Sequence, residues 1–177
     1  MIASLGEILW DLLPSGRRFG GAPANFACHA AALGAEVYLV SRVGDDALGR
    51  QAYEVLQRPG LSTRFVGQST RFATGQVQGT LDREGVAHYT FGQDEAWDHL
   101  DGPQELIQMA PRVTAVCFGT LGQRQVAAQR TIHQFLDSTA KTALRVLDLN
   151  LRPPYYNDAT LQESLSRANV LKLNTEE

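Results

Sequence analysis

The segment Gly20-Gly21-Ala22-Pro23-Ala24-Asn25 has the residue types of a ligand-binding turn. Two adjacent glycines let the backbone approach a ligand with no Cβ in the way. Pro23 favours the first turn of a helix, whose free N–H groups point back toward the loop. Asn25, in that turn, can both donate and accept hydrogen bonds. The pattern indicates a site for a polyhydroxylated ligand, and a plain structural turn is the alternative.

Four further motifs accompany this segment. They are Gly6-Glu7-Ile8-Leu9-Trp10-Asp11, Arg42-Val43-Gly44-Asp45-Asp46-Ala47-Leu48-Gly49, Asp148-Leu149-Asn150-Leu151-Arg152-Pro153-Pro154 and Asn174-Thr175-Glu176-Glu177. In this order, the five motifs resemble the signatures of the ribokinase-like (phosphofructokinase B) carbohydrate kinases. The Asp148–Pro154 motif is most similar to that of fructokinases.

The resemblance implies roles for particular residues. Asp11, Gly21 and Asn25 would bind sugar hydroxyls, and Gly20 and Gly21 would also act as a hinge. Arg152 would approach the transferred phosphate, since a guanidinium fork suits an anion. The alternatives are a loop cap for Asp11 and a surface ion pair for Arg152.

The resemblance also implies ATP and Mg²⁺ as cofactors. Asn174 and Glu177 would help to order Mg²⁺ and its waters, because Mg²⁺ usually keeps several waters; a frayed terminus is the alternative for Glu177. Members of the family continue beyond this length, and their Gly-Ala-Gly-Asp motif supplies an anion hole and the catalytic base. That motif does not occur in these 177 residues. We therefore expect residues 1–177 to be the N-terminal, sugar-binding part, without the C-terminal ATP-binding and catalytic part, and to turn over poorly alone.

Apolar strands and helices alternate along most of the chain. This order predicts an α/β fold with a mostly parallel, Rossmann-like sheet flanked by helices. Strands are expected at 2–10, 37–43, 115–120, 145–149 and 170–173, and helices at 24–33, 47–57, 104–109, 123–138 and 159–168.

The middle of the chain is rich in β-forming residues at 63–66, 74–81 and 86–91, with a hairpin turn at 82–85. Gln76, Gln78 and Thr80 alternate with Val77, Gly79 and Leu81, as in a strand with one solvated face. We expect a small antiparallel β lid over the sugar, with strands within about 11–20 and 63–91. Its exposed edges suggest a homodimer through the lid strands.

Composition excludes some classes of function. The net charge is −3 and the basic residues are scattered, so no nucleic-acid partner is expected. No apolar run has the roughly 20 residues of a membrane span, so we expect no membrane association and a cytoplasmic location. Cys28 and Cys117 lie in apolar runs and are expected to be buried, reduced thiols.

The sequence leaves the substrate open. The favoured reaction is ATP-dependent phosphorylation of O6 of fructose, with ribokinase and 2-keto-3-deoxygluconate kinase as alternatives. A non-catalytic sugar-binding fragment is a further alternative. A nucleoside kinase is less favoured, because no aromatic clamp for a base is evident. A dinucleotide-binding protein is disfavoured, because Gly-x-Gly-x-x-Gly does not follow the first strand.

Overall fold

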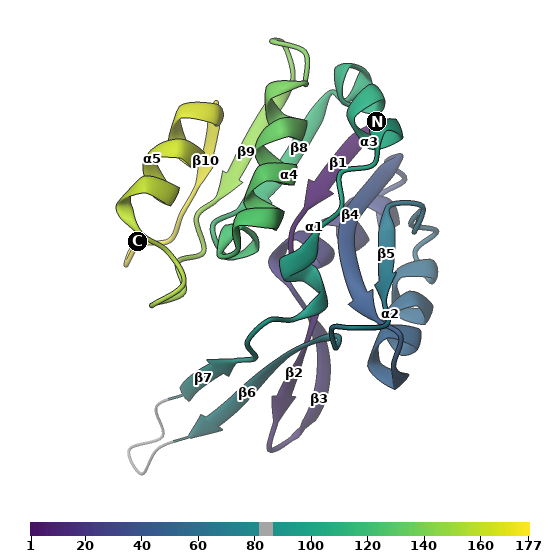
Figure 1. The fold of residues 1–177 in the computed structure, drawn as a ribbon, viewed down its shortest axis with the longest axis vertical. Coiled ribbons are helices and arrows are strands. Elements are labelled where there is room, and N and C mark those ends of the chain that lie inside the picture. Colours follow the sequence, from purple (N-terminus) through teal and green to yellow (C-terminus); the bar gives the residue numbers. More distant parts are fainter. Residues whose placement is uncertain (82–86) are drawn as a thin grey trace.

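The computed structural model describes residues 1–81 and 87–177 and places them in two sheets (Figure 1). Six parallel strands form the main sheet, in the order β10-β9-β8-β1-β4-β5. They span Val170–Lys172 (β10), Leu144–Asp148 (β9), Ala115–Gly119 (β8), Ile2–Leu5 (β1), Val37–Gly44 (β4) and Val66–Ser69 (β5). The α/β expectation is confirmed.

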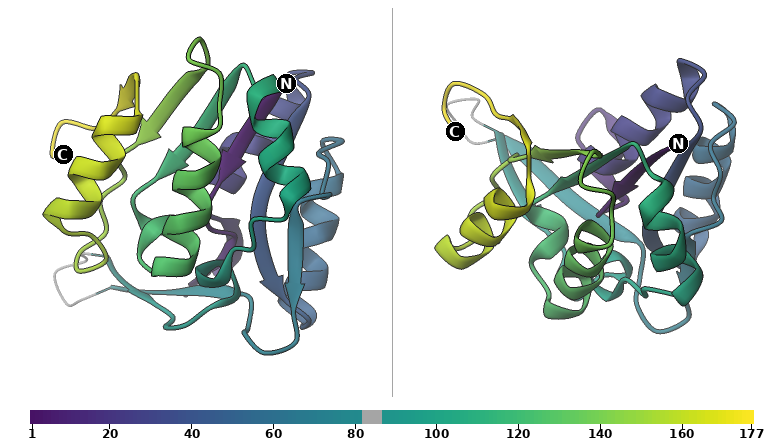
Figure 2. Two further views of the ribbon diagram at one scale, coloured as in Figure 1. Left: turned by 45° about the horizontal axis from the view of Figure 1, so that its top comes forward. Right: turned by 90° about the horizontal axis from the view of Figure 1, so that it is seen from above.

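Helices cover both faces of the main sheet (Figure 2). On one face, α1 (Ala22–Ala32) and α2 (Ala47–Gln57) bury Ala24, Ala27, Ala52 and Leu56 against strand residues such as Leu39. On the other lie α3 (Gln104–Met109), α4 (Val126–Asp137) and α5 (Asp158–Arg167). Their core includes Leu106, Ile132 and Phe135. This double cover explains why the central strands β1, β4 and β8 are rich in apolar residues.

The second sheet contains four strands in the order β3-β2-β6-β7 and projects from the body as the lid sheet. The strands span Gly16–Gly20 (β3), Leu9–Leu13 (β2), Gly75–Leu81 (β6) and Ala87–Phe91 (β7). The pairing is mixed rather than purely antiparallel: β2 runs parallel to β6, and the outer pairs are antiparallel. The expected hairpin turn at 82–85 lies outside the described residues.

Two expectations about individual strands were wrong. The single strand expected over residues 2–10 is divided between the sheets, because Gly6 adopts a φ of +143° and turns the chain between β1 and β2. The segment at 63–66, grouped above with the lid, leads instead into β5. That strand pairs with β4 of the main sheet, with Val66 opposite Ser41.

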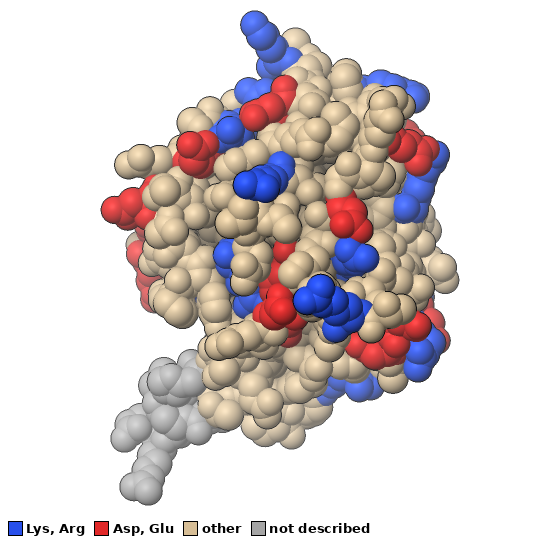
Figure 3. All heavy atoms as spheres, viewed as in Figure 1, with Lys and Arg blue, Asp and Glu red and all other residues tan. Residues whose placement is uncertain are grey.

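Other features concern the surface and the thiols. Positive and negative side chains are interspersed over the face shown in Figure 3. In the part of the chain that the structure describes, no helix has the length and apolar character needed to cross a membrane. Both cysteines are free thiols. Cys117 is buried as expected, whereas Cys28 on α1 is only half-buried, so the expected burial was wrong for that residue.

Candidate functional site

A cavity of about 330 Å³ opens where the lid sheet meets the carboxyl ends of the main-sheet strands. Ligands of open parallel sheets characteristically bind at this end. Its volume lies within the range of small-molecule sites. The lining residues are Glu7, Leu9, Asp11, Gly21, Ala22, Asn25, Val77, Tyr89, Phe91, Leu121, Asp148, Asn150, Arg152 and Lys172.

Asp11 enters the cavity from strand β2 of the lid sheet. Its side chain is half-buried, and its neighbour across the β2–β3 ladder is Arg18. Burial raises the pKa of Asp11, while Arg152 and Arg18 act in the opposite direction. Gly20 lies directly beside this carboxylate, since a Cβ added there would be 2.7 Å from Oδ2. Asp11 is therefore a carboxylate acceptor within reach of ligand hydroxyls, and Gly20 makes room for it.

Gly21 and Asn25 form the part of the wall where α1 begins. Gly21 is the N-cap residue of α1, with a φ of 102° that favours glycine. Its carbonyl oxygen accepts a hydrogen bond from the Asn25 backbone N–H at 2.9 Å. The amide side chain of Asn25 is exposed and lines the same cavity as Asp11.

Arg152 lines the same cavity and follows the end of β9 in the chain. Its Nη2 donates a hydrogen bond to Asn150 Oδ1 at 2.9 Å, and its guanidinium is solvent-exposed. Asp148, at the end of β9, accepts a hydrogen bond from Lys172 Nζ at 2.8 Å. The structure thus brings Asp11, Gly21, Asn25 and Arg152 to one cavity, from segments more than 100 residues apart.

Asn174 and Glu177 lie outside this cavity lining. Asn174 Oδ1 accepts hydrogen bonds from the backbone N–H groups of Glu176 and Glu177. The Glu177 carboxylate accepts one from Leu151 at 2.8 Å and one from the Asn174 backbone at 3.0 Å. These oxygens hold residues 174–177 in a turn and join it to Leu151. Within residues 1–81 and 87–177, no cluster of three or more His, Cys, Asp or Glu is placed to hold a metal.

Glu7 is a residue of the cavity wall to which sequence reasoning gave no role. It follows Gly6 in the β1–β2 connection and is 2% exposed. Burial raises its pKa to about 7, against hydrogen bonds from the backbone N–H groups of Glu7 and Ala22. Its carboxyl group lies between the beginning of α1, where Ala22 donates to it, and Gly122, and local sequence gives no signal of these contacts.

Tyr89 and Phe91 were also missed as site residues. The alternation along β7 brings both to the same side of the lid sheet, and both line the cavity. Phe91 also meets Tyr155 edge-on, with ring centroids 5.4 Å apart. Residues 86–91 were identified from the sequence only as rich in β-forming residues, and the alternation of their side chains is the signal that could have indicated Tyr89 and Phe91.

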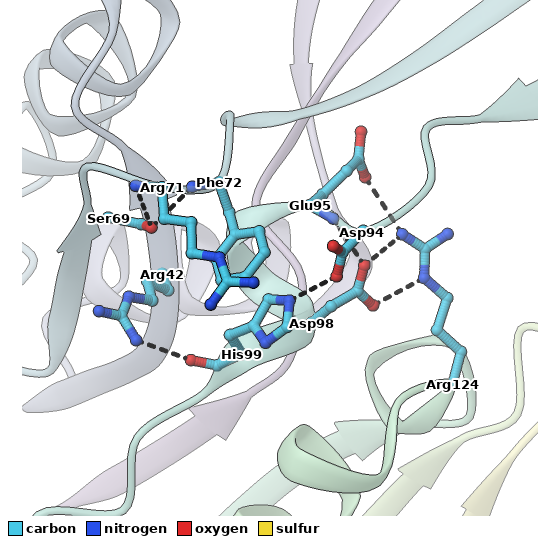
Figure 4. A network of polar contacts seen from close by, with 9 residues as sticks. All are labelled: Arg42, Ser69, Arg71, Phe72, Asp94, Glu95, Asp98, His99 and Arg124. Carbon is cyan, nitrogen blue, oxygen red and sulfur yellow. Dashed lines mark hydrogen bonds and ion pairs between the residues drawn. The ribbon is translucent and has the colours of Figure 1, made fainter.

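The carboxylate of Glu95 is also buried, and it holds the segments before β6 and after β7 that join the lid sheet to the body. Figure 4 shows it facing Arg124. Its Oε1 accepts the Gln76 backbone N–H at 2.6 Å, and its Oε2 accepts the Trp97 indole N–H at 2.8 Å. The Arg124 guanidinium faces Glu95 and forms two hydrogen bonds with Asp98, at 2.7 and 2.6 Å. This ion cluster fixes the beginning of β6 and the segment after β7 to the body.

Comparison with known proteins agrees with the fold and the motifs. Residues 15–177 match the family model described as pfkB family carbohydrate kinase. A fructokinase of Salmonella typhimurium is 31% identical over 185 residues, which cover 98% of this chain and 60% of the relative. A sugar kinase of Pyrococcus horikoshii is 28% identical over 203 residues, covering 100% of this chain and 62% of the relative.

Solved structures give the same result. An uncharacterized sugar kinase of P. horikoshii superposes with a TM-score of 0.84 at 25% identity, covering 97% of this chain and 64% of that one. A structure of the same protein in complex with ATP has the same TM-score and identity and is covered to 62%. The chain therefore spans about 60% of the length of the relatives it matches.

Proposed function

The chain belongs to the pfkB family of carbohydrate kinases, and on that basis we propose that it carries the sugar-binding part of an ATP-dependent kinase acting on O6 of fructose. The match to the family model over residues 15–177 establishes the membership. The fructokinase name of the relative at 31% identity supports the choice of sugar.

One observation carries the proposal: a single cavity collects polar groups suited to a sugar and a cation suited to a phosphate. Asp11 offers carboxylate oxygens to neighbouring hydroxyls, and Asn25 offers both a donor and an acceptor. Arg152 lies across the cavity, where its guanidinium would counter charge on a transferred phosphoryl group. The sugar would therefore lie between Asp11 and Arg152.

The lid sheet supplies the apolar side of this cavity. Leu9, Val77 and Phe91 of the lid sheet pack with Trp97 and Leu121 of the body. Excluding water at this place would favour transfer to sugar over hydrolysis of ATP. Closure of the lid sheet over the sugar is part of the proposed mechanism.

ATP and Mg²⁺ belong to the proposed reaction of the whole enzyme. The ATP complex of the P. horikoshii relative supports ATP as the phosphoryl donor. Mg²⁺ would supply charge neutralisation at the phosphates, with Asn174 and Glu177 ordering its waters. The general base is expected in the Gly-Ala-Gly-Asp segment, which this chain lacks, so we expect sugar binding without rapid turnover from the chain alone.

The test is calorimetric titration of the chain with fructose, ribose and 2-keto-3-deoxygluconate, alongside an ATP-coupled assay. We expect fructose to bind most tightly, with binding lost in Asp11→Ala and retained in Asp137→Ala, which removes an exposed carboxylate of α4. Tighter binding of ribose or the keto acid would assign the alternative sugar kinases. Sugar binding without turnover, even when the missing part is supplied, would favour a non-catalytic module, and failure to bind any sugar would refute the proposal.

We also propose that a second copy of the chain pairs with the lid sheet. Strands β3 and β7 are its edges, and an edge strand presents unpaired backbone groups. The proposed dimer predicts a concentration-dependent mass in sedimentation. A monomer at all concentrations, with the sugar site intact, would refute it.

A further inference from the structure

Glu7 has an unusual position for a charged side chain. It lies between β1 and β2, in one of the connections that join the lid sheet to the body, and is 2% exposed. Its Oε1 accepts the backbone N–H of Ala22, the first residue of α1, at 3.0 Å. Its Oε2 is buried without a hydrogen-bond partner among the described residues. Buried carboxylates are expensive unless they are fully paired, so this placement calls for a reason beyond packing.

The bond from Glu7 reaches the residues assigned to the sugar. Ala22 is the first residue of α1, and it follows Gly21, whose carbonyl oxygen accepts the Asn25 N–H. Gly21 also packs directly on the backbone of Glu7 and Ile8, as a Cβ at Gly21 would lie 3.4 Å from Ile8 Cα. The Glu7 carboxylate thus holds the turn that presents both Gly21 and Asn25 to the cavity.

We propose that Glu7 is a positioning residue of the sugar site: its carboxylate fixes the beginning of α1, and thereby Gly21 and Asn25, against the β1–β2 connection. This inference rests on the proposed function, because the ligand it serves is the sugar. It assigns to Glu7 a role in sugar affinity, exerted through the backbone of Ala22 rather than by transfer of the phosphoryl group.

The ionisation of Glu7 can be observed separately from the stability of the fold, and it depends on the charged groups around the carboxyl group. The ionisable groups that act on it are Asp148 at the end of β9, Arg152 and the Cys117 thiol of β8. Burial raises the pKa of Glu7 to about 7, so its ionisation can be followed near neutral pH. The Ala22 amide proton, which is bonded to it, should report that ionisation as a change in chemical shift.

The experiment compares the wild-type chain with Glu7→Gln, Glu7→Leu and the control Glu54→Gln, an exposed glutamate of α2. Each is titrated calorimetrically with fructose, and its thermal unfolding is recorded. Glutamine keeps the acceptor for the Ala22 N–H, so we expect affinity within about threefold of wild type. Leucine fills the buried space without an acceptor, so we expect affinity to fall about tenfold or more while the fold is retained.

Nitrogen-15 spectra recorded on both sides of pH 7 complete the test. We expect the Ala22 amide to titrate in the wild type and in Glu54→Gln and to be flat in Glu7→Gln. If the wild type binds fructose and folded Glu7→Leu binds it equally well, the role of Glu7 is refuted and the sugar site stands. If the wild type binds no sugar, the proposed function fails. The spectra then decide the role of Glu7: an Ala22 amide indifferent to pH, or Asn25 signals unchanged in Glu7→Leu, would overturn it.

Discussion

Among the glycines with a positive φ, Gly21 is the one whose replacement by alanine should lower the free energy of unfolding most. Gly21 has a φ of 102° and a ψ of 118°, a region in which an L residue is strained. An added Cβ would also lie closer than 3.0 Å to the Glu7 carbonyl oxygen and 3.1 Å from its carbon. The substitution therefore combines backbone strain with a collision between the two lid connections.

Gly16→Ala separates these two effects. Gly16 has a similar φ of 118°, but a Cβ added there meets no atom within 4 Å. Strain alone costs about 1–3 kcal/mol, which is our expectation for Gly16→Ala. Overpacking adds about 1–3 kcal/mol, so the free energy of unfolding should fall by about 2–6 kcal/mol in Gly21→Ala.

Urea denaturation of both variants measures the difference directly, and thermal melting should show Gly21→Ala about 2–12 °C below Gly16→Ala. Sugar binding should be lost in Gly21→Ala and kept in Gly16→Ala, because only Gly21 lines the cavity. Equal destabilisation of the two variants would show that the backbone around Glu7 can move to accept a Cβ at Gly21. The conclusion that Gly21 and Glu7 are tightly packed would then be wrong.

Three further predictions concern single side chains. Asp46 caps α2 and accepts three hydrogen bonds, which lower its pKa although burial opposes them. Asp46→Ala should lower the free energy of unfolding at pH 7 by about 1–2 kcal/mol, and this loss should shrink as the pH falls through the lowered pKa of Asp46. Asp45→Ala, a substitution of its exposed neighbour, should cost under about 0.5 kcal/mol. Equal costs for the two variants would contradict the assignment of Asp46 as the cap. Arg124→Ala leaves two buried carboxylates without their cation and should cost about 3–5 kcal/mol by urea denaturation. Arg50→Ala, in an exposed pair at 3.7 Å, should cost less than about 1 kcal/mol; similar values for both would refute the buried cluster. Burial raises the pKa of Cys117 to about 12, so a thiol reagent should modify it only after unfolding, and rapid modification of the native chain at neutral pH would contradict its placement.

The sequence predicted those elements whose signals are local. The helix expected at 47–57 is α2 to the residue, because its N-cap aspartate and its amphipathic spacing both lie within the segment. The helix expected at 104–109 is α3, and the alternation of strands and helices gave the parallel sheet. Membership of the family, which the motifs indicated, is confirmed by the match over residues 15–177.

Features that depend on long-range contact could not be predicted in the same way. Residues 2–10 are mostly apolar, and their pattern does not show that Gly6 transfers the chain from one sheet to the other. The β-rich segment was expected at 63–66 and grouped with the lid, whereas the strand spans Val66–Ser69 and belongs to the main sheet through its pairing with β4. For the site, the motifs indicated Asp11, Gly21, Asn25 and Arg152, which share a cavity, but their roles remain predictions.

Two buried glutamates, Glu7 and Glu95, hold the lid sheet to the body in different ways. Glu95 has Arg124 as a partner and holds the β6 and β7 connections within a closed ion cluster. In the described part of the chain, the Glu7 carboxylate has only one hydrogen-bond donor besides its own backbone. The rise in its pKa from 4.5 to about 7 means that ionising it in the folded chain costs about 3 kcal/mol more than in water. Since this pKa is raised on folding, the associated stability is present at low pH and is lost as the pH rises through 7. A group held at such a cost beside a ligand cavity is characteristic of functional sites. On the proposed function, we therefore expect sugar binding to stabilise the lid sheet mainly at the β1–β2 and β3–α1 connections.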